Sequence, residues 1–167
     1  MRLALYQPDI PQNTGAMLRF AACMGIPVDI IEPCGFLLDD RKMRRVGMDY
    51  LAHVSVTRHI SWDRFAETHG QRGGRLILLT TRAAIPYPSF TFAPDDTILV
   101  GRESAGVPDD IHAVADARLL IPMVEGVRSL NVALAAAMVT GEALRQTGGF
   151  AIPRPVPQAV PQQEEGP

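Results

Sequence analysis

The sequence contains little that would mark a secreted, membrane-bound or metal-binding protein. Its two cysteines, Cys23 and Cys34, are too few for a disulfide scaffold and lack partners at zinc-ligand spacing. We interpret them as reduced thiols, which are typical of cytoplasmic proteins. No apolar run approaches the ~20 residues of a transmembrane helix. No signal peptide is visible either, because the apolar residues 2–6 run straight into Gln7–Asp9. We therefore expect a cytoplasmic protein without a membrane or metal partner.

Excess positive charge is also missing, but the cations that are present cluster. The formal net charge is −2, which does not mark a nucleic-acid-binding protein. Lys42 is the only lysine, so every other cation is arginine, the residue better suited to forked phosphate contacts. Arg41, Lys42, Arg44 and Arg45 stand close together. By itself this cluster fits either a solvated helix end or a phosphate-binding surface.

The length and composition predict one domain and a short tail. A chain of 167 residues with 47% apolar and 20% charged residues is long enough, and apolar enough, for one soluble domain with its own core. We place this domain at residues 1–150. Residues 151–167 are rich in proline and glutamine and hold almost nothing that could pack, so we expect a disordered tail.

Strand and helix patterns alternate along the chain. Short, nearly continuous apolar strands are expected at residues 2–6, 28–31, 75–80, 97–100 and 119–121, and residues 54–57 alternate as in an edge strand. Helices are expected at residues 13–24, 39–46, 62–68, 108–114 and 131–146, with Asn13, Ser61, Pro108 and Ser129 at their starts. This order predicts an α/β fold, with a parallel sheet covered by helices on both faces.

The last predicted helix is apolar nearly all round. Residues 131–146 are alanine-rich and proline-free, which favours a strong helix, and their apolar side chains do not keep to one face. A monomer of this size could not easily hide so much apolar surface. We therefore predict a homodimer that uses this helix and the helix at residues 13–24.

The polar loops after three strands form the candidate site. Ligands of parallel sheets bind beyond the carboxyl ends of the strands, and loops with suitable residues follow Leu79, Val100 and Ile121. No G-x-G-x-x-G motif follows any predicted strand, which argues against a dinucleotide-binding protein.

Three separated motifs carry a resemblance to a known family. They are N-x-G-x-x-x-R at Asn13–Arg19, G-x-E-x-x-G-V-P at Gly101–Pro108, and I-P-M followed by S-x-N within Ile121–Asn131. In this order and spacing they resemble the SPOUT superfamily of RNA methyltransferases. Shorter stretches at residues 31–33, 44–50, 57–59 and 79–81 are similar to the small TrmL-type tRNA wobble-nucleotide 2′-O-methyltransferases. The resemblance covers residues 3 to about 148.

The resemblance implies a fold, a reaction and an assembly. The fold would be a SPOUT α/β-knot, in which the C-terminal part of the parallel sheet forms a deep trefoil knot, a rare exception among protein topologies. The enzyme would use S-adenosyl-L-methionine to methylate the ribose 2′-hydroxyl at position 34 of the tRNA anticodon stem-loop, with S-adenosyl-L-homocysteine as product. It would act as a homodimer whose sites borrow residues from both subunits.

The resemblance also assigns residues, position by position. Arg19 would be the catalytic residue, and no metal would take part. Its guanidinium is effectively never deprotonated, so it suits orienting the hydroxyl and stabilising the developing alkoxide better than acting as a base. Contacts to RNA would come from Asn13 and from Arg41, Lys42, Arg44 and Arg45. Cofactor contacts would come from Leu79, Thr80, Gly101, Glu103, Ile121, Met123, Ser129 and Leu130.

Two alternatives stay open from the sequence. The same chemistry on ribosomal RNA is one, although those relatives usually add an N-terminal RNA-binding domain, whereas here the first strand starts at residue 2. A cofactor-binding RNA module that no longer catalyses is the other. The presence of Arg19 argues against this alternative. Gly141 stands where many relatives have a tyrosine, so how tightly the nucleoside is bound is left open.

Overall fold

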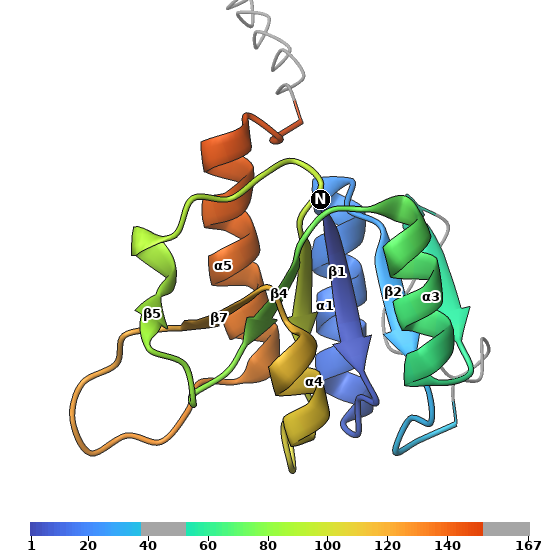
Figure 1. The fold of residues 1–167 in the computed structure, drawn as a ribbon, viewed down its shortest axis with the longest axis horizontal. Helices are drawn as coiled ribbons and strands as arrows, with labels where there is room; N and C mark the ends of the chain where they lie inside the picture. The colour runs from blue at the N-terminus through green and yellow to red at the C-terminus, as the bar shows by residue number, and fades with distance from the viewer. Residues whose placement is uncertain (38–52, 152–167) are drawn as a thin grey trace, which may run out of the picture.

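Seven parallel strands form one sheet in the order β3-β2-β1-β6-β4-β7-β5 (Figure 1). The computed structural model describes residues 1–37 and 53–151, so the helix predicted at residues 39–46 lies outside the described residues. The sheet confirms the predicted α/β class. Its strands are β1 (Arg2–Tyr6), β2 (Val28–Ile31), β3 (Val56–His59), β4 (Leu76–Leu79), β5 (Ile85–Pro86), β6 (Thr97–Val100) and β7 (Ala117–Leu120).

Helices cover both faces of this sheet. On one face lie α1 (Pro11–Met24) and α5 (Val132–Thr147), and on the other lie α3 (Trp62–Arg72) and α4 (Asp109–Val114) (Figure 1). A short 3₁₀ helix, η2, spans Tyr87–Ser89. None of the helices in the described part of the chain is long and apolar enough to cross a membrane.

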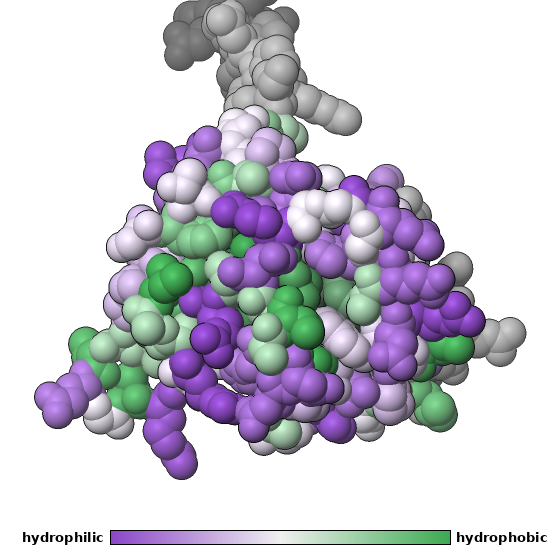
Figure 2. Space-filling view, in the orientation of Figure 1, coloured by the Kyte–Doolittle hydropathy of each residue, from purple (hydrophilic) through white to green (hydrophobic). Residues whose placement is uncertain are grey.

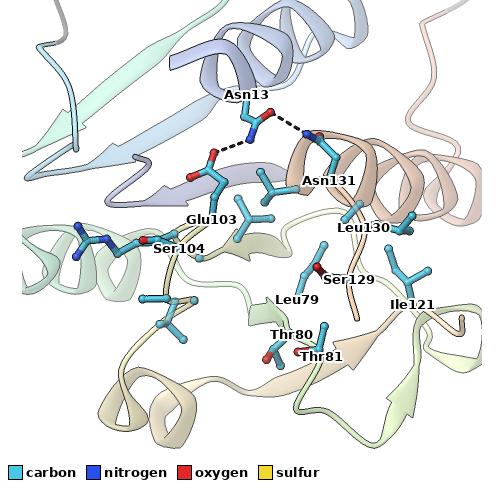
Figure 3. Close-up of a pocket in the computed structure, with 18 of the residues that line it drawn as sticks. Asn13, Leu79, Thr80, Thr81, Glu103, Ser104, Ile121, Ser129, Leu130 and Asn131 are labelled. Atoms are coloured by element: carbon cyan, nitrogen blue, oxygen red, sulfur yellow. Dashed lines mark hydrogen bonds between the residues drawn. The ribbon is translucent and has the colours of Figure 1, made fainter. Parts of the chain in front are cut away.

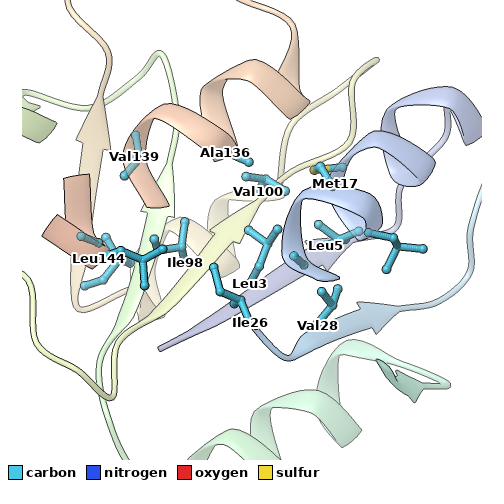
Figure 4. Packing of buried hydrophobic residues seen from close by; sticks show 14 of the residues in the cluster. Leu3, Leu5, Met17, Ile26, Val28, Ile98, Val100, Ala136, Val139 and Leu144 are labelled. Carbon is cyan, nitrogen blue, oxygen red and sulfur yellow. The ribbon is translucent and has the colours of Figure 1, made fainter. Parts of the chain in front are cut away.

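Alternation along β1 divides the core into two clusters. Leu3 and Leu5 pack with Met17 of α1 and with Ala136 and other residues of α5, as Figure 4 shows. The intervening side chains of β1 belong to a second cluster, which includes Phe65 of α3 and Ile111 of α4. Successive side chains of a strand point to opposite faces, so the nearly continuous apolar strands are what a sheet covered on both faces requires.

A buried carboxylate holds the amino-terminal half of the sheet to α3. Asp29 of β2 is fully buried and accepts hydrogen bonds from Arg2 Nε at 2.8 Å, Arg72 Nη1 at 3.1 Å and Nη2 at 3.2 Å. His59 Nε2 of β3 lies 2.8 Å from Asp29 Oδ1. Burial by itself would raise the pKa of Asp29, but the hydrogen bonds from Arg2, Arg72 and His59 lower it to about 2.

Several helix boundaries differ from those predicted. Asn13 does not cap α1, because that helix begins at Pro11 after Ile10. Pro108 is the N-cap residue of α4 rather than its first helical residue. Ser129 does not cap α5, since the oxygen of Asn131 accepts from the backbone N–H groups of Ala133 and Leu134. Ser61 does cap α3, which runs four residues beyond the predicted end at residue 68.

The strand at the edge of the sheet was not predicted, and it changes the topology. β5 holds two residues, one of them a proline, so no apolar run marks it. It pairs with β7, which lies between β4 and β5 although these two follow each other in the sequence. At the other edge, β3 begins at Val56 instead of the predicted residue 54. The segment from Thr80 to Asp96 therefore bridges over a strand that comes later in the chain.

Candidate functional site

A cavity of about 600 Å³ lies at the carboxyl ends of β4, β6 and β7. The loops that follow these three strands form it, as expected for a parallel sheet. Figure 3 shows their side chains converging on it from separate parts of the chain. The cavity brings together all eight residues of the predicted cofactor set: Leu79, Thr80, Gly101, Glu103, Ile121, Met123, Ser129 and Leu130.

The walls of this cavity combine apolar side chains with a few hydroxyl groups. Leu79, Ile121 and Leu130 supply apolar surface, while Thr80 and Ser129 supply hydroxyls (Figure 3). Small-molecule sites commonly have this composition and volumes of roughly 300–1,000 Å³. The cavity can therefore hold one nucleoside-sized ligand, with apolar contacts for a flat ring and polar groups to orient it.

The loop after β6 closes on itself at the cavity wall. Arg102 N donates to Gly106 O at 3.0 Å, and Gly106 N donates to Arg102 O at 2.8 Å. A Cβ on Gly101 would lie 2.6 Å from the carbonyl carbon of Gly106. A glycine in a binding loop often lets the backbone approach a ligand, but the structure gives another reason for Gly101: the opposite side of the same loop occupies the space that a Cβ would need.

Alanine at position 101 is expected to open this loop. Its Cβ would overlap backbone atoms, which cannot rotate away as a side chain could, so the cavity wall has to shift. We expect the affinity for the cofactor to fall at least ~10-fold, equivalent to ~1.4 kcal/mol, in calorimetry. Gly70→Ala is the matched control, because a Cβ there meets nothing within 4 Å. Equal affinities of the two variants would contradict this explanation of Gly101.

A chain of side-chain hydrogen bonds crosses the rim of the cavity. Asn13 Nδ2 donates to Glu103 Oε1 at 3.0 Å, and Asn131 Nδ2 donates to Asn13 Oδ1 at 2.9 Å (Figure 3). Asn131 in turn caps α5. The amide of Asn13 thus joins the loop after β6 to the start of α5, which explains an asparagine here without any helix cap.

Arg19, the predicted catalytic residue, lies outside this cavity. It is exposed on α1 and is not among the residues that line the cavity. It follows Asn13 by six residues, which is ~9 Å along a helix axis and leaves the two side chains about 120° apart around it. The remaining residues of the predicted RNA-binding set lie outside the described residues: Arg41, Lys42, Arg44 and Arg45.

The sequence reasoning missed other residues around the cavity. Thr81, Arg128 and Ala135 line it; the first two stand next to predicted residues, and nothing in the sequence marks Ala135. Asp9 was missed as well, although its place in an irregular loop directly after the first strand could have singled it out. Across residues 1–37 and 53–151, His, Cys, Asp and Glu form no group of three or more that could hold a metal ion.

Comparisons with known proteins agree with one another. The sequence profile of the SpoU rRNA Methylase family matches residues 1–141. A tRNA (cytidine(34)-2′-O)-methyltransferase from Beijerinckia indica subsp. indica is 58% identical over 157 residues, which cover 94% of this chain and 98% of the relative. A solved structure described as "Structural insights into the 2-OH methylation of C/U34 on tRNA" is 41% identical with a TM-score of 0.81, covering 87% of this chain and 94% of that one.

A more distant structure shares the fold. The SpoU methyltransferase AviRb from Streptomyces viridochromogenes, in complex with the cofactor AdoMet, is 24% identical with a TM-score of 0.76. It covers 87% of this chain, and this chain spans 60% of it.

Proposed function

The chain belongs to the SpoU rRNA methylase family, and from this premise we propose that it methylates the ribose 2′-hydroxyl of nucleotide 34 in tRNA with S-adenosylmethionine as donor. The observation that carries the proposal is the cavity at the strand ends, which gathers the predicted cofactor residues of the second and third motifs together with Leu79 and Thr80. Relatives with this activity match almost the whole chain. The tRNA reaction is therefore preferred to methylation of ribosomal RNA.

The cavity fits S-adenosylmethionine. Its apolar walls suit the adenine ring, and Thr80 and Ser129 suit the polar groups of the ligand. When bound, the cofactor supplies an electrophilic methyl group on a sulfonium and leaves as S-adenosylhomocysteine. Glu103 does not act as a base in this scheme. Its carboxylate accepts from Asn13 Nδ2 and from Asp9 N, so we assign it to holding the cavity wall.

Arg19 is the residue to which we assign catalysis. A guanidinium keeps its proton, so it cannot take one from the ribose. It can donate hydrogen bonds to the 2′-oxygen and to a neighbouring phosphate, which orients the hydroxyl and stabilises the negative charge that develops on it. The hydroxyl proton leaves to solvent water as the 2′-oxygen takes the methyl group. Contacts of Arg41, Lys42, Arg44 and Arg45 with RNA phosphates complete the proposal, and Asn13 serves at the edge of the RNA site.

We further propose a homodimer in which Arg19 acts at the cavity of the other subunit. Arg19 is exposed on α1 and does not line the cavity of its own chain. On α5, which packs against α1, Leu134 is 59% and Met138 is 43% exposed. Figure 2 also shows apolar surface over the loop that follows β7. A second copy covering these residues would hide the apolar surface and bring Arg19 to a cavity.

Glutamate at position 134 should dissociate this dimer. It would place a charge on the apolar face of α5, and burying an unpaired charge is costly. We expect light scattering to give the mass of a dimer for the wild type at micromolar concentration and of a monomer for Leu134→Glu. Ile60→Glu, at an apolar residue after β3 that is even more exposed than Leu134, should stay dimeric. A monomeric wild-type protein would contradict the assembly.

The proposal also includes the knot, the domain bounds and the cellular location. We infer that the C-terminal part of the sheet is knotted, and the insertion of β7 between β4 and β5 supports this topology. We keep the assignment of residues 1–150 to one domain and of residues 151–167 to a tail. We place the protein in the cytoplasm, where its tRNA substrate is found.

Methylation of defined tRNAs tests the function. The purified protein is incubated with S-adenosylmethionine and cytidine-34 or uridine-34 tRNA transcripts, and the nucleosides are analysed by mass spectrometry. We expect 2′-O-methylated cytidine or uridine at position 34, and none when nucleotide 34 is a 2′-deoxynucleotide. Methylation that persists on the deoxy substrate, or that occurs only on ribosomal RNA, would overturn the proposed function.

A further inference from the structure

Asp9 lies behind the cavity and holds one of its walls. Its carboxylate accepts from the backbone N–H groups of Glu103 at 3.1 Å and Ser104 at 3.3 Å, and from the hydroxyl of Ser104. Asp9 does not line the cavity, whereas Glu103 and Ser104 do. The Ser104 hydroxyl and the backbone N–H groups of Ser104 and Glu103 donate to this carboxylate and favour its charged form, so the pKa of Asp9 lies below its ordinary value. The side chain is therefore ionised at neutral pH and accepts from both amides.

The contact between the two loops is reciprocal. Asp9 N donates to Glu103 Oε2 at 3.1 Å while the Asp9 carboxylate accepts from Glu103 N. Two residues earlier, Gln7 Oε1 accepts from Arg102 Nη1 at 3.3 Å. Residues 7–9 thus contact residues 102–104 along their length. The loop after β1 therefore supports the loop after β6 and determines its conformation.

The loop after β1 is itself held in place by the loop after β2. Gly35 N donates to Pro8 O at 2.9 Å, and a Cβ on Gly35 would lie 2.7 Å from the Cβ of Asp9. Gln7 has a φ of 43°, a left-handed conformation that non-glycine residues adopt only when their surroundings enforce it. The position of the Asp9 carboxylate is therefore determined by its own loop and by the loop after β2.

We propose that Asp9 is a positioning residue of the cofactor site, whose carboxylate holds the loop Gly101–Gly106 in the shape that binds S-adenosylmethionine. This role rests on the proposed function, since it specifies how the same cavity is built. Asp9 does not touch the cofactor. It acts through the backbone of Glu103 and Ser104, and through Glu103 it also fixes the acceptor for Asn13.

The test separates cofactor binding from chemistry. In Asp9→Asn one of the two acceptor oxygens becomes an NH₂ group, which cannot accept from a backbone amide. We expect the Kd for S-adenosylmethionine in calorimetry, and the cofactor KM, to rise roughly 10–100-fold, as for lost charge-assisted hydrogen bonds. The kcat at saturating cofactor should stay within about 3-fold. Asp9→Glu keeps the carboxylate and should recover most of the affinity, and Asp63→Asn, at an exposed carboxylate of α3, should match the wild type.

Hydrogen exchange locates the effect in the loop. Amides of residues 101–106 should exchange faster in free Asp9→Asn than in the wild type, while β1 and β6 stay protected. Wild-type affinity in Asp9→Asn, or faster exchange throughout the sheet, would overturn the positioning role. If that variant does not fold, Ser104→Ala decides, since removing its hydroxyl should weaken cofactor binding ~3-fold or more. A wild-type protein that binds no cofactor would instead contradict the proposed function.

Discussion

Replacing Arg19 by alanine is expected to reduce methyl transfer by ~10²–10³-fold, the effect of removing one donor to a developing oxyanion. Binding of S-adenosylmethionine should not change, because Arg19 does not line the cavity of its own chain and is assigned to the ribose and phosphate of the RNA in the partner's site. Single-turnover methylation of tRNA measures the first quantity and calorimetry the second. Arg64→Ala removes an exposed arginine of α3 and serves as the control for charge. Near wild-type methylation by Arg19→Ala would remove Arg19 from the catalytic site.

Mixing two variants, at a cofactor concentration too low to fill the opened cavity of Gly101→Ala, tells in which subunit Arg19 acts. Arg19→Ala has an intact cavity, and Gly101→Ala has an intact Arg19 but an opened cavity wall. If Arg19 serves the cavity of the partner, the mixed dimer holds one complete site. Activity should then appear after the two proteins are exchanged through monomers, up to about a quarter of the wild-type level. Absence of any recovery, with mixed dimers present, would place Arg19 in the site of its own chain.

Loss of Asp29 is expected to have the largest effect on stability. Alanine at 29 would leave the guanidinium groups of Arg2 and Arg72 without their shared carboxylate in a partly buried site. Breaking a buried ion pair from one side costs about 3–5 kcal/mol, a large part of the ~5–15 kcal/mol by which a domain is stable. Urea unfolding at pH 7 measures the change. Glu67→Ala removes an exposed ion pair on α3 and should cost less than ~1 kcal/mol.

The pH dependence of unfolding adds a second readout. The pKa of Asp29 is lowered in the folded protein to about 2 from its ordinary value of 3.8. Its contribution, about 2–3 kcal/mol by linkage, is therefore present above pH ~4 and is lost as the pH falls toward 2. Asp29→Ala should lack this part of the acid dependence. Identical slopes for variant and wild type between pH 4 and 2 would show that Asp29 does not contribute it.

Local sequence predicted the strands better than the starts of the helices. The apolar run Leu76–Leu79 leaves little choice, because burial on both faces of a parallel sheet demands it. Near the start of α5, Ser129 and Asn131 are both good capping residues, and local propensity does not choose between them. Tertiary structure does, since Asn131 also bonds to Asn13. β5 could not be predicted, because a two-residue strand containing a proline exists only through its pairing with β7.

The residues of the candidate site also differ in how far the sequence could predict them. Motif residues such as Leu79 and Ser129 could be placed together from the sequence, because parallel strands end at the same edge. The loop position of Asp9 could have drawn attention to it, but its partners could not be predicted, since they lie more than ninety positions away. The reason for Gly101 was also missed. A glycine in a sequence shows only that a Cβ is absent, and the structure shows that Gly106 fills the space.

The pairing of β5 with β7 sets the order in which a nascent chain can mature. Within the described sheet β5 has no other neighbour, so it stays without a partner until β7 has left the ribosome. Translation at about 5–20 residues per second leaves the segment from Thr80 to Asp96 open for seconds. Helix α5 and about a third of the residues that line the cavity are made later still. β7 must therefore insert between β4 and β5, which have both been synthesised before it. The complete cavity for S-adenosylmethionine exists only after the chain has been translated into α5.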